Sequence, residues 1–494
     1  MSDSVIYLRN RNVSIYILLI FSVVIAGFSI VEIINKPTGD TGWYFAIIFF
    51  SSLWIALYII AAWRTFKHIY LFSTAYLTAL IMFHLGLFYQ RVIGDIKFPS
   101  SWEHGSFSPW LESAGWHTIL ALSAFGIGFA IAVSSGKNNL KFINPILIGH
   151  VKKVGHWSSI GLLVASVVFF IFAIYSYGNI FNYARHEIFS SHADSRGFGV
   201  FMMIFPGSVL LYLFSASNRN QNLFGLGLAL FAFVIFMFSG YRSTALFPCL
   251  VGVVMWIKSG RKIPVLVVVS GISIILVLIA ASGYLRTMGK YSELSLTDVT
   301  KALDEASIES SISEMGSSVK ALASVLQLVP NKDEYRYGSS YAHSLIDSLP
   351  NIGVRVNIEG SREHALQEKN TDPDALQQLR PADWLTYRIA PWHFSRGYGV
   401  GFSAIAEPYL NFGTIGVLFF FIGLGFVLGK LDSIPIYQSP RVLVFSASML
   451  WFLISTVRND SSNLFKPCVF TILILLAWWA FSKIVLMKNI QWRV

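Results

Sequence analysis

The sequence predicts an all-α, polytopic integral membrane protein of about twelve transmembrane helices, from its composition, hydropathy and charge pattern. Hydrophobic residues make up 54% of the 494 residues and charged residues only 13%, with a mean hydropathy of +0.60. A soluble globular chain carries about 25% charged residues. The composition therefore excludes a soluble enzyme, a nucleic-acid-binding protein and a disordered chain. Both cysteines, Cys249 and Cys468, lie in apolar runs, which excludes a disulfide scaffold.

Each transmembrane helix needs about 20 mostly apolar residues. Runs of this kind predict spans at residues 13–34, 42–62, 69–89, 114–135, 157–178, 198–216, 221–239, 243–257, 263–282, 402–429, 441–457 and 465–482. The eighth is short, and we expect the first to be a retained helix rather than a cleaved signal. The chain thus divides into helices 1–9 (residues 1–282), a long loop with amphipathic helices (283–400) and helices 10–12 (401–494).

The orientation follows from Lys and Arg, which concentrate in short cytoplasmic loops. With the N-terminus in the cytoplasm, the inside segments carry seventeen of these residues and the short outer loops eight. We therefore expect both termini in the cytoplasm and the loop 283–400 outside. The net charge of +11 is then largely a topology signal, and nucleic acid is not an expected partner.

The long loop contains two patterns that predict structure. Thr297 and Asp298 can cap a helix, and apolar residues then recur at helical spacing, which predicts a stripe that packs on the bundle rather than a specific lipid site: Ile312, Met315, Val319, Leu322 and Leu326. Aromatic residues near the end of the loop suit a membrane–water interface: Trp384, Tyr387, Trp392, Phe394 and Tyr398.

Four arginines lie at the predicted outer ends of helices: Arg242 in "SGYRS", Arg286 in "YLRTMGK", Arg396 before "GYGVG" and Arg458 in "VRND". An ionisable residue near the bilayer is costly and indicates a functional site, and arginine binds phosphate through a planar fork of donors. Together they predict an outer anion site. A single arginine at a helix end can instead snorkel to the interface, which is the simpler interpretation of Arg396 alone, and Asp460 could pair with Arg458.

Two residues are candidates for a general base. Glu407 lies about one turn into the tenth span, followed by Pro408, which we expect to disturb the helix there. It could act as the base or as a structural partner of an arginine. His393 titrates near neutral pH, although a lone interfacial histidine is more often structural. The sequence contains no nucleotide-binding glycine loop and no metal-binding motif, so we expect neither a cofactor nor a metal.

These features resemble a known family. The "SGYRS" turn, the long loop with its "LPNIG" turn, the segment "GFSAIAEPYLNFGTIG" and the last "VRND" turn are similar to the Wzy-type O-antigen polymerases over roughly residues 160–480. The resemblance implies an enzyme of the bacterial inner membrane with a helical, glycosyltransferase-C-like bundle. It implies that undecaprenyl-pyrophosphate-linked oligosaccharide repeat units are joined at a periplasmic site, beside a flippase and a chain-length regulator.

The resemblance also transfers pyrophosphate binding to Arg242, Arg286 and Arg458. Two alternatives remain open. An O-antigen ligase would use the same donor and pass the chain to a different acceptor. A lipid-linked oligosaccharide flippase would belong to another class, although the absence of an internal repeat and the outer position of the ionisable residues favour an enzyme.

Overall fold

The computed structural model describes residues 13–35, 37, 42–93, 107–135, 144–177, 196–238, 241–261, 271, 277–278, 315–316, 318–349, 379–395 and 399–486, and every regular element among them is helical. The elements are α1 (Val13–Ile34), α2 (Trp43–Phe66), α3 (Phe72–His84), α4 (Gly86–Ile93), α6 (Ser108–Ser134), α7 (Pro145–Tyr177), α9 (Arg196–Ser215), α10 (Arg219–Phe238), α11 (Arg242–Lys258), α15 (Ser318–Leu328), α16 (Ser339–Ile346), α19 (Pro381–Ile389), α20 (Pro391–Ser395), α21 (Ala406–Asp432), α22 (Pro440–Ser448), α23 (Leu450–Ser455), the 3₁₀ turn η3 (Thr456–Arg458) and α24 (Ser462–Leu486).

The number of apolar helices confirms the predicted fold class. Within the described residues, nine helical stretches are long and apolar enough to cross a membrane, and the bent pair α3–α4 makes a tenth. The predicted eighth span is α11, whose 17 residues are at the lower limit for a span. The predicted ninth span, 263–282, lies outside the described residues except at positions 271, 277 and 278.

Two predicted spans differ from the observed helices. α7 begins at Pro145 rather than at residue 157, because Lys152 and Lys153 interrupt the hydropathy but are good helix formers. The predicted span 69–89 is broken, since α3 and α4 meet at an angle of 60°. The second helix of this pair begins with Gly86, a residue of low helix propensity.

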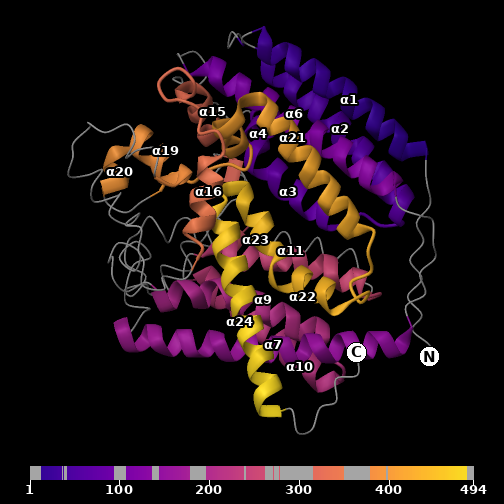
Figure 1. Ribbon diagram of the computed structural model, residues 1–494. Helices are drawn as coiled ribbons and strands as arrows, with labels where there is room; N and C mark the ends of the chain where they lie inside the picture. The colour runs from indigo at the N-terminus through magenta and orange to yellow at the C-terminus, as the bar shows by residue number, and fades with distance from the viewer. Residues whose placement is uncertain are drawn as a thin grey trace.

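The helices form two groups, each around one buried helix (Figure 1). α6 packs against α1, α2, α15 and α21, whereas α9 packs against α7, α10, α11 and α22. These two central spans are each 83% buried. Contacts of α11 with α3 and α23 join the groups, so the whole molecule shares one apolar core.

Glycines allow α6 and α21 to approach closely. A Cβ atom on Gly128 of α6 would lie 1.9 Å from the carbonyl oxygen of Ile422, and one on Gly425 of α21 would lie 2.1 Å from that of Phe125. Small residues at facing positions are typical of transmembrane helix pairs, in which packing rather than the hydrophobic effect drives association. This reciprocal contact fixes where α21, and therefore its first turn, lies.

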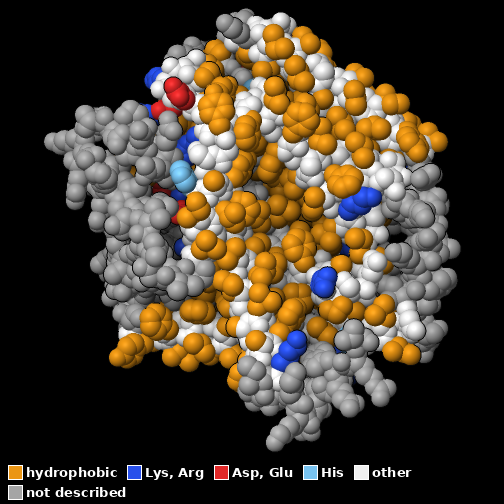
Figure 2. Space-filling view, in the orientation of Figure 1, with side chains coloured by type: hydrophobic (Ala, Val, Ile, Leu, Met, Phe, Trp, Pro, Cys, Tyr) orange, Lys and Arg blue, Asp and Glu red, His pale blue; other side chains and the backbone are white. Residues whose placement is uncertain are grey.

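Hydrophobic side chains cover much of the described surface that Figure 2 shows, with few charges among them. Large apolar side chains on several helices are more than half exposed, among them Ile20 on α1 (65%), Leu230 on α10 (65%) and Leu476 on α24 (54%). Apolar surface of this extent on a soluble protein would cause aggregation. It indicates contact with lipid.

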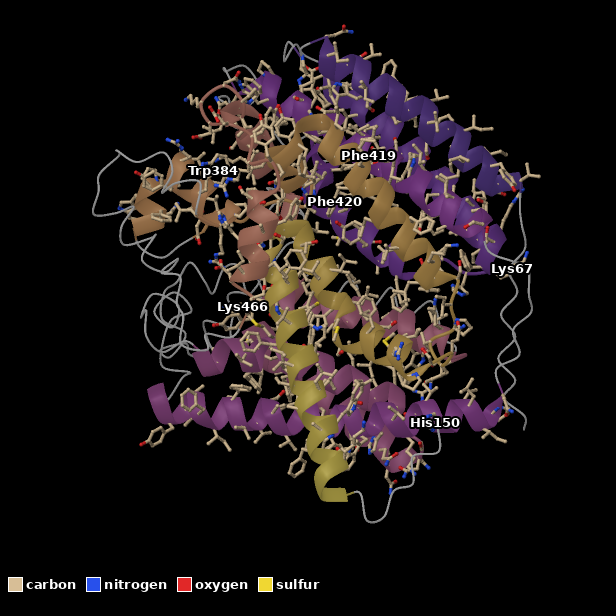
Figure 3. All side chains as sticks on the ribbon, viewed as in Figure 1. Lys67, His150, Trp384, Phe419, Phe420 and Lys466 are labelled. Atoms are coloured by element: carbon tan, nitrogen blue, oxygen red, sulfur yellow. The ribbon has the colours of Figure 1, made fainter. Side chains whose placement is uncertain are left out.

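The helices of the long loop gather at one end of the bundle, which we call the loop end and which comprises α15, α16, α19 and α20 (Figure 1). Figure 3 places Trp384 and Lys466 on this side and Lys67 and His150 on the opposite side. The apolar stripe of α15 packs against α6 as predicted, with Val319 and Leu322 fully buried. The predicted capping residues, Thr297 and Asp298, lie outside the described residues.

The aromatic residues of this end differ from the prediction. Trp384 and Phe394 are buried, with exposed fractions of 2% and 0%, because they pack inside the loop helices rather than at a lipid interface. Trp392 is 58% exposed, as an interfacial residue would be. Tyr398 lies outside the described residues.

The opposite end is held by a buried ion pair. The carboxylate of Asp432, at the end of α21, accepts hydrogen bonds from the backbone N–H groups of Phe72 (2.7 Å) and Ser73 (3.1 Å) and thereby caps α3. Lys258, at the end of α11, donates to the backbone oxygens of Asp432 (2.8 Å) and Leu431 (3.2 Å). One acidic residue thus joins three helices at this end.

The glycine contact between α6 and α21 predicts a stability difference. Gly128→Ala adds a methyl group where a Cβ atom would overlap a backbone oxygen, and overpacking typically costs about 1–3 kcal/mol. Gly423→Ala on α21 is the matched control, because its Cβ atom would meet nothing within 4 Å. Thermal unfolding of the detergent-purified protein should show a lower melting temperature for Gly128→Ala only. Equal melting temperatures for the two variants would contradict the close approach.

Candidate functional site

The carboxylate of Glu407 lies at a junction of three segments at the loop end. Glu407 is in the first turn of α21 and is 4% exposed. Its oxygens accept hydrogen bonds from the backbone N–H of Ser461 (2.7 Å), from the Ser461 hydroxyl (2.6 Å) and from the Ser340 hydroxyl (3.1 Å). Ser340 belongs to α16 and Ser461 directly precedes α24. A buried carboxylate needs such partners, so this group ties the loop to the bundle.

α21 is broken one turn after this carboxylate. Phe412 and Gly413 have non-helical backbone angles, and Gly413 has φ +63°, which glycine adopts without strain. The carbonyls of Leu410 and Asn411 accept hydrogen bonds from the backbone of segment 336–338, at 2.9 Å from Arg336 and 3.1 Å from Tyr337. The loop therefore supplies donors to a broken helix in an apolar span, where unpaired backbone groups are costly.

Arg336 is a buried cation that the sequence analysis missed. Its side chain donates to the carbonyl of Leu379 (2.8 Å), and its guanidinium carbon lies 5.4 Å from the ring centre of Trp384. Burial lowers the pKa of Arg336 to about 10, while the nearby negative charge of Glu407 opposes that shift. Arg336 therefore stays charged at neutral pH. In the sequence it is one of many charged residues of the long loop, and no local pattern distinguishes it.

Asp460 links the first residues of α19 and α24 at this junction. The carboxylate is 1% exposed and accepts hydrogen bonds from the Ser462 hydroxyl (2.5 Å), the Asn463 amide (3.3 Å) and the backbone N–H of Ala382 (3.3 Å). These donors lie at the first residues of α24 and α19. The carboxylate therefore links the first residues of these two helices, and its pairing with Arg458 stays a prediction.

Arg458 ends η3, and Arg242 begins α11. The guanidinium carbon of Arg458 is 5.8 Å from the ring centre of Phe83, and its carbonyl accepts a hydrogen bond from the backbone of Phe402 (2.9 Å). Phe83 also contacts Phe247, at 6.3 Å between ring centres, and Phe247 lies little more than one turn after Arg242 at the start of α11. Phe83 thus lies between Arg458 and α11, the helix that begins with Arg242.

The other sequence candidates are less well placed or fall outside the structure. Arg286 and Arg396 lie outside the described residues. His393 is exposed on α20, where its ring packs edge-on against Trp392, and Figure 1 shows α20 at the outer edge of the loop end. Of the two candidate bases, Glu407 is therefore the one that lies at the junction with α24.

A histidine–serine pair anchors the start of α21. Nε2 of buried His84 lies 2.7 Å from the hydroxyl of Ser403, and that hydroxyl accepts hydrogen bonds from the backbone of Ile405 (3.1 Å) and Ala406 (3.2 Å). Since Nδ1 of His84 faces the carbonyl of Leu80 (3.2 Å), the serine donates to Nε2. The described residues include no group of three or more His, Cys, Asp or Glu side chains that could hold a metal ion.

The fold and this junction define a polytopic helical membrane protein with a long loop packed on one end of its bundle. A family model described as O-antigen polysaccharide polymerase Wzy matches residues 13–489, nearly the whole chain. The chain therefore belongs to this family, as the sequence motifs indicated. Membership supports O-antigen polymerase activity, a lipid-linked oligosaccharide substrate and a multi-pass membrane location. No curated protein and no solved structure matches the chain.

The hydrogen bonds of Glu407 predict that loss of one donor makes the protein less stable. Ser340→Ala removes one donor from the buried carboxylate, and a hydrogen bond to a charged group typically contributes about 1.5–3 kcal/mol. Ser339→Ala is the control, because Ser339 is only half-buried and lies beside Ser340 on α16. We expect Ser340→Ala alone to lower the melting temperature and to expose α16 to limited proteolysis. Identical proteolysis patterns for both variants would show that the junction does not hold the loop.

Proposed function

We propose that this protein polymerises polyprenyl-pyrophosphate-linked oligosaccharide repeat units by glycosyl transfer on the periplasmic face of the inner membrane. The observation that carries the proposal is the junction at the loop end. The chain before α21 and the chain before α24 meet there through the Phe402–Arg458 and Glu407–Ser461 hydrogen bonds. A cation suited to a diphosphate and a carboxylate suited to a proton are therefore held in one small region.

The reaction needs little acid catalysis, because a diphosphate is a good leaving group. The acceptor hydroxyl oxygen forms a bond to the anomeric carbon of the donor sugar, and the bond from that carbon to the diphosphate oxygen breaks. The diphosphate leaves with the electron pair. Arg242 and Arg458, with Arg286 and Arg396, would stabilise this charge, and one such fixed donor typically contributes about 2.7–4 kcal/mol.

The proton of the attacking hydroxyl passes to a base, for which Glu407 and His393 are the candidates. General base catalysis contributes roughly 10²–10⁴-fold. Glu407 is held in place by its serine partners, whereas His393 is exposed. The geometry therefore favours Glu407, and the experiment below separates the two.

The charge bias of the short loops supports a periplasmic loop end and cytoplasmic termini. Lys258 and Lys430 lie at the opposite end, where Lys430 donates to Ser135 (2.7 Å). A flippase that delivers the lipid-linked unit and a chain-length regulator are the expected partners. The domain division at residues 282 and 400 is part of this proposal, because the loop would then hold the catalytic region outside the cytoplasm.

Arg242→Lys tests the anion site, because lysine keeps the charge but loses the planar fork. In a strain that lacks the native gene, we expect this variant to yield lipopolysaccharide with single repeat units and few long chains. Arg219→Lys is the control, since Arg219 starts α10 at the end opposite to Arg242 and is exposed. A normal ladder on a gel would remove Arg242 from the mechanism. Loss of all attached antigen in the gene deletion would indicate a ligase.

Glu407→Gln and His393→Gln test the base. With purified protein and lipid-linked repeat units, we expect Glu407→Gln to reduce kcat by about 10²-fold or more and His393→Gln to change it little. Gel filtration checks that each variant is folded, because the amide introduced by Glu407→Gln would lie beside the donors of Ser461. Full activity in a folded Glu407→Gln variant would exclude this carboxylate as the base.

A further inference from the structure

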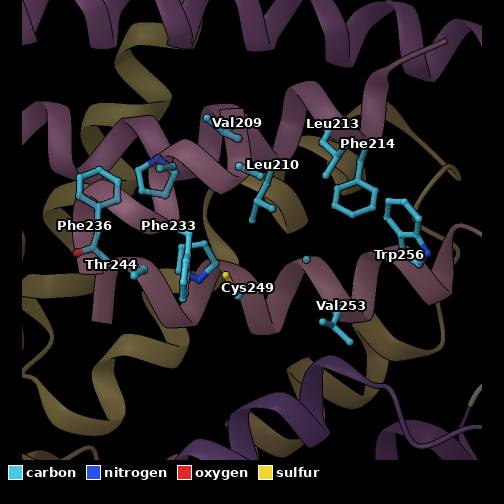
Figure 4. A pocket seen from close by; sticks show the side chains of 16 residues that line it. Val209, Leu210, Leu213, Phe214, Phe233, Phe236, Thr244, Cys249, Val253 and Trp256 are labelled. Carbon is cyan, nitrogen blue, oxygen red and sulfur yellow. The ribbon is translucent and has the colours of Figure 1, made fainter. Parts of the chain in front are cut away.

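An apolar cavity of about 270 Å³ lies between α9, α10 and α11 (Figure 4). Its walls are almost entirely hydrophobic, with Phe236 and Thr244 at one end and Phe214 and Trp256 at the other. Helix cores are normally packed without voids of this size. The cavity therefore requires an explanation from the sequence.

Two prolines and small residues produce the cavity. Pro206 in α9 and Pro248 in α11 line it, and a proline inside a helix removes a backbone hydrogen bond and bends the helix. Ala232 and Gly252 present little side chain toward the space between the bent helices. A Cβ atom on Gly252 would meet only the Leu210 side chain, at 3.3 Å. The opening is thus built into the sequence of three neighbouring helices.

One end of the cavity lies at the first turn of α11, the helix that begins with Arg242. The backbone N–H of Tyr241 donates to the carbonyl of Phe236 (2.8 Å), which lines the cavity, and Thr244 follows Arg242 in the first turn of α11. From Thr244 to Trp256 the cavity follows α11 for about 18 Å, at 1.5 Å per residue. A molecule that fills it would have its apolar part along α11 and its head beside a guanidinium.

We propose that this cavity binds the first isoprene units of the polyprenyl tail of the donor, with the diphosphate at Arg242. This inference rests on the proposed function and adds the place of the tail. A diphosphate carries more negative charge than a single phosphodiester. Arg242, near the Thr244 end of the cavity, would therefore favour a polyprenyl diphosphate over a membrane phospholipid. The apolar walls contribute because each buried CH₂ group is worth about 0.8 kcal/mol.

The test compares two donors that carry the same repeat unit, one with a 55-carbon polyprenyl tail and one with a single isoprene unit. Gly252→Phe fills the cavity, and Gly227→Phe on α10 is the matched control, because its Cβ atom would meet nothing within 4 Å. We expect Gly252→Phe to reduce the ratio of kcat/KM for the long donor over the short donor about tenfold. Gly227→Phe should leave the ratio unchanged. An unchanged ratio in Gly252→Phe would overturn the proposal.

A second measurement covers a Gly252→Phe variant that fails to fold. Cys249 lines the cavity, and the other cysteine of the chain, Cys468, is on α24. In a Cys468→Ser variant, undecaprenyl diphosphate should slow alkylation of Cys249 by N-ethylmaleimide at least threefold, whereas dioleoyl phosphatidylglycerol should not. Equal protection by both lipids, or by neither, would overturn the proposal. A wild-type protein that elongates neither donor but shows selective protection would instead contradict the proposed function alone.

Discussion

The loop end depends on one buried charge, the carboxylate of Glu407. A carboxylate in an apolar span is stable only when donors surround it, and a hydrogen bond to a charged group typically contributes about 1.5–3 kcal/mol. Two of its hydrogen bonds come from Ser461, directly before α24, and the third comes from Ser340 of α16, so the carboxylate joins the bundle to the loop. The position of the loop helices, the path of segment 402–407 and the position of η3 therefore follow from the same set of hydrogen bonds.

The break in α21 is a second place where the bundle and the loop depend on each other. A helix that ends its regular hydrogen bonding within an apolar span leaves carbonyl groups without partners. Segment 336–338 supplies the missing donors, and the side-chain oxygen of Asn411 accepts a further hydrogen bond from Gly338 (2.9 Å). Segment 336–338 of the long loop is thus part of the hydrogen bonding of a membrane-spanning helix.

Hydropathy was sufficient to predict most spans, because the cost of burying charge in lipid leaves a strong local signal. Hydropathy did not predict where the regular hydrogen bonding of α21 is interrupted. Pro408, which was expected to disturb this helix, lies in its first turn, where proline is tolerated. The break comes instead at Gly413. Glu407 and Arg458 were recognisable because charge is rare in spans. The sequence did not point to Arg336, Ser340 and Ser461, since their roles arise from contacts between residues distant in sequence.

In the proposed reaction, stabilisation of the leaving diphosphate requires cations that are fixed before the substrate binds, because reorientation during the reaction would consume the electrostatic gain. Arg458 meets this condition through two restraints: its guanidinium lies on Phe83, and its backbone is bonded to Phe402. His84 follows Phe83 on α3 and accepts the hydrogen bond of Ser403, beside Phe402. The Phe83 ring beside the Arg458 guanidinium and the Phe402 segment that bonds to the Arg458 backbone are therefore linked through the His84–Ser403 hydrogen bond. Rigidity at this arginine consequently comes from the buried polar pair, which has no need to contact the substrate itself.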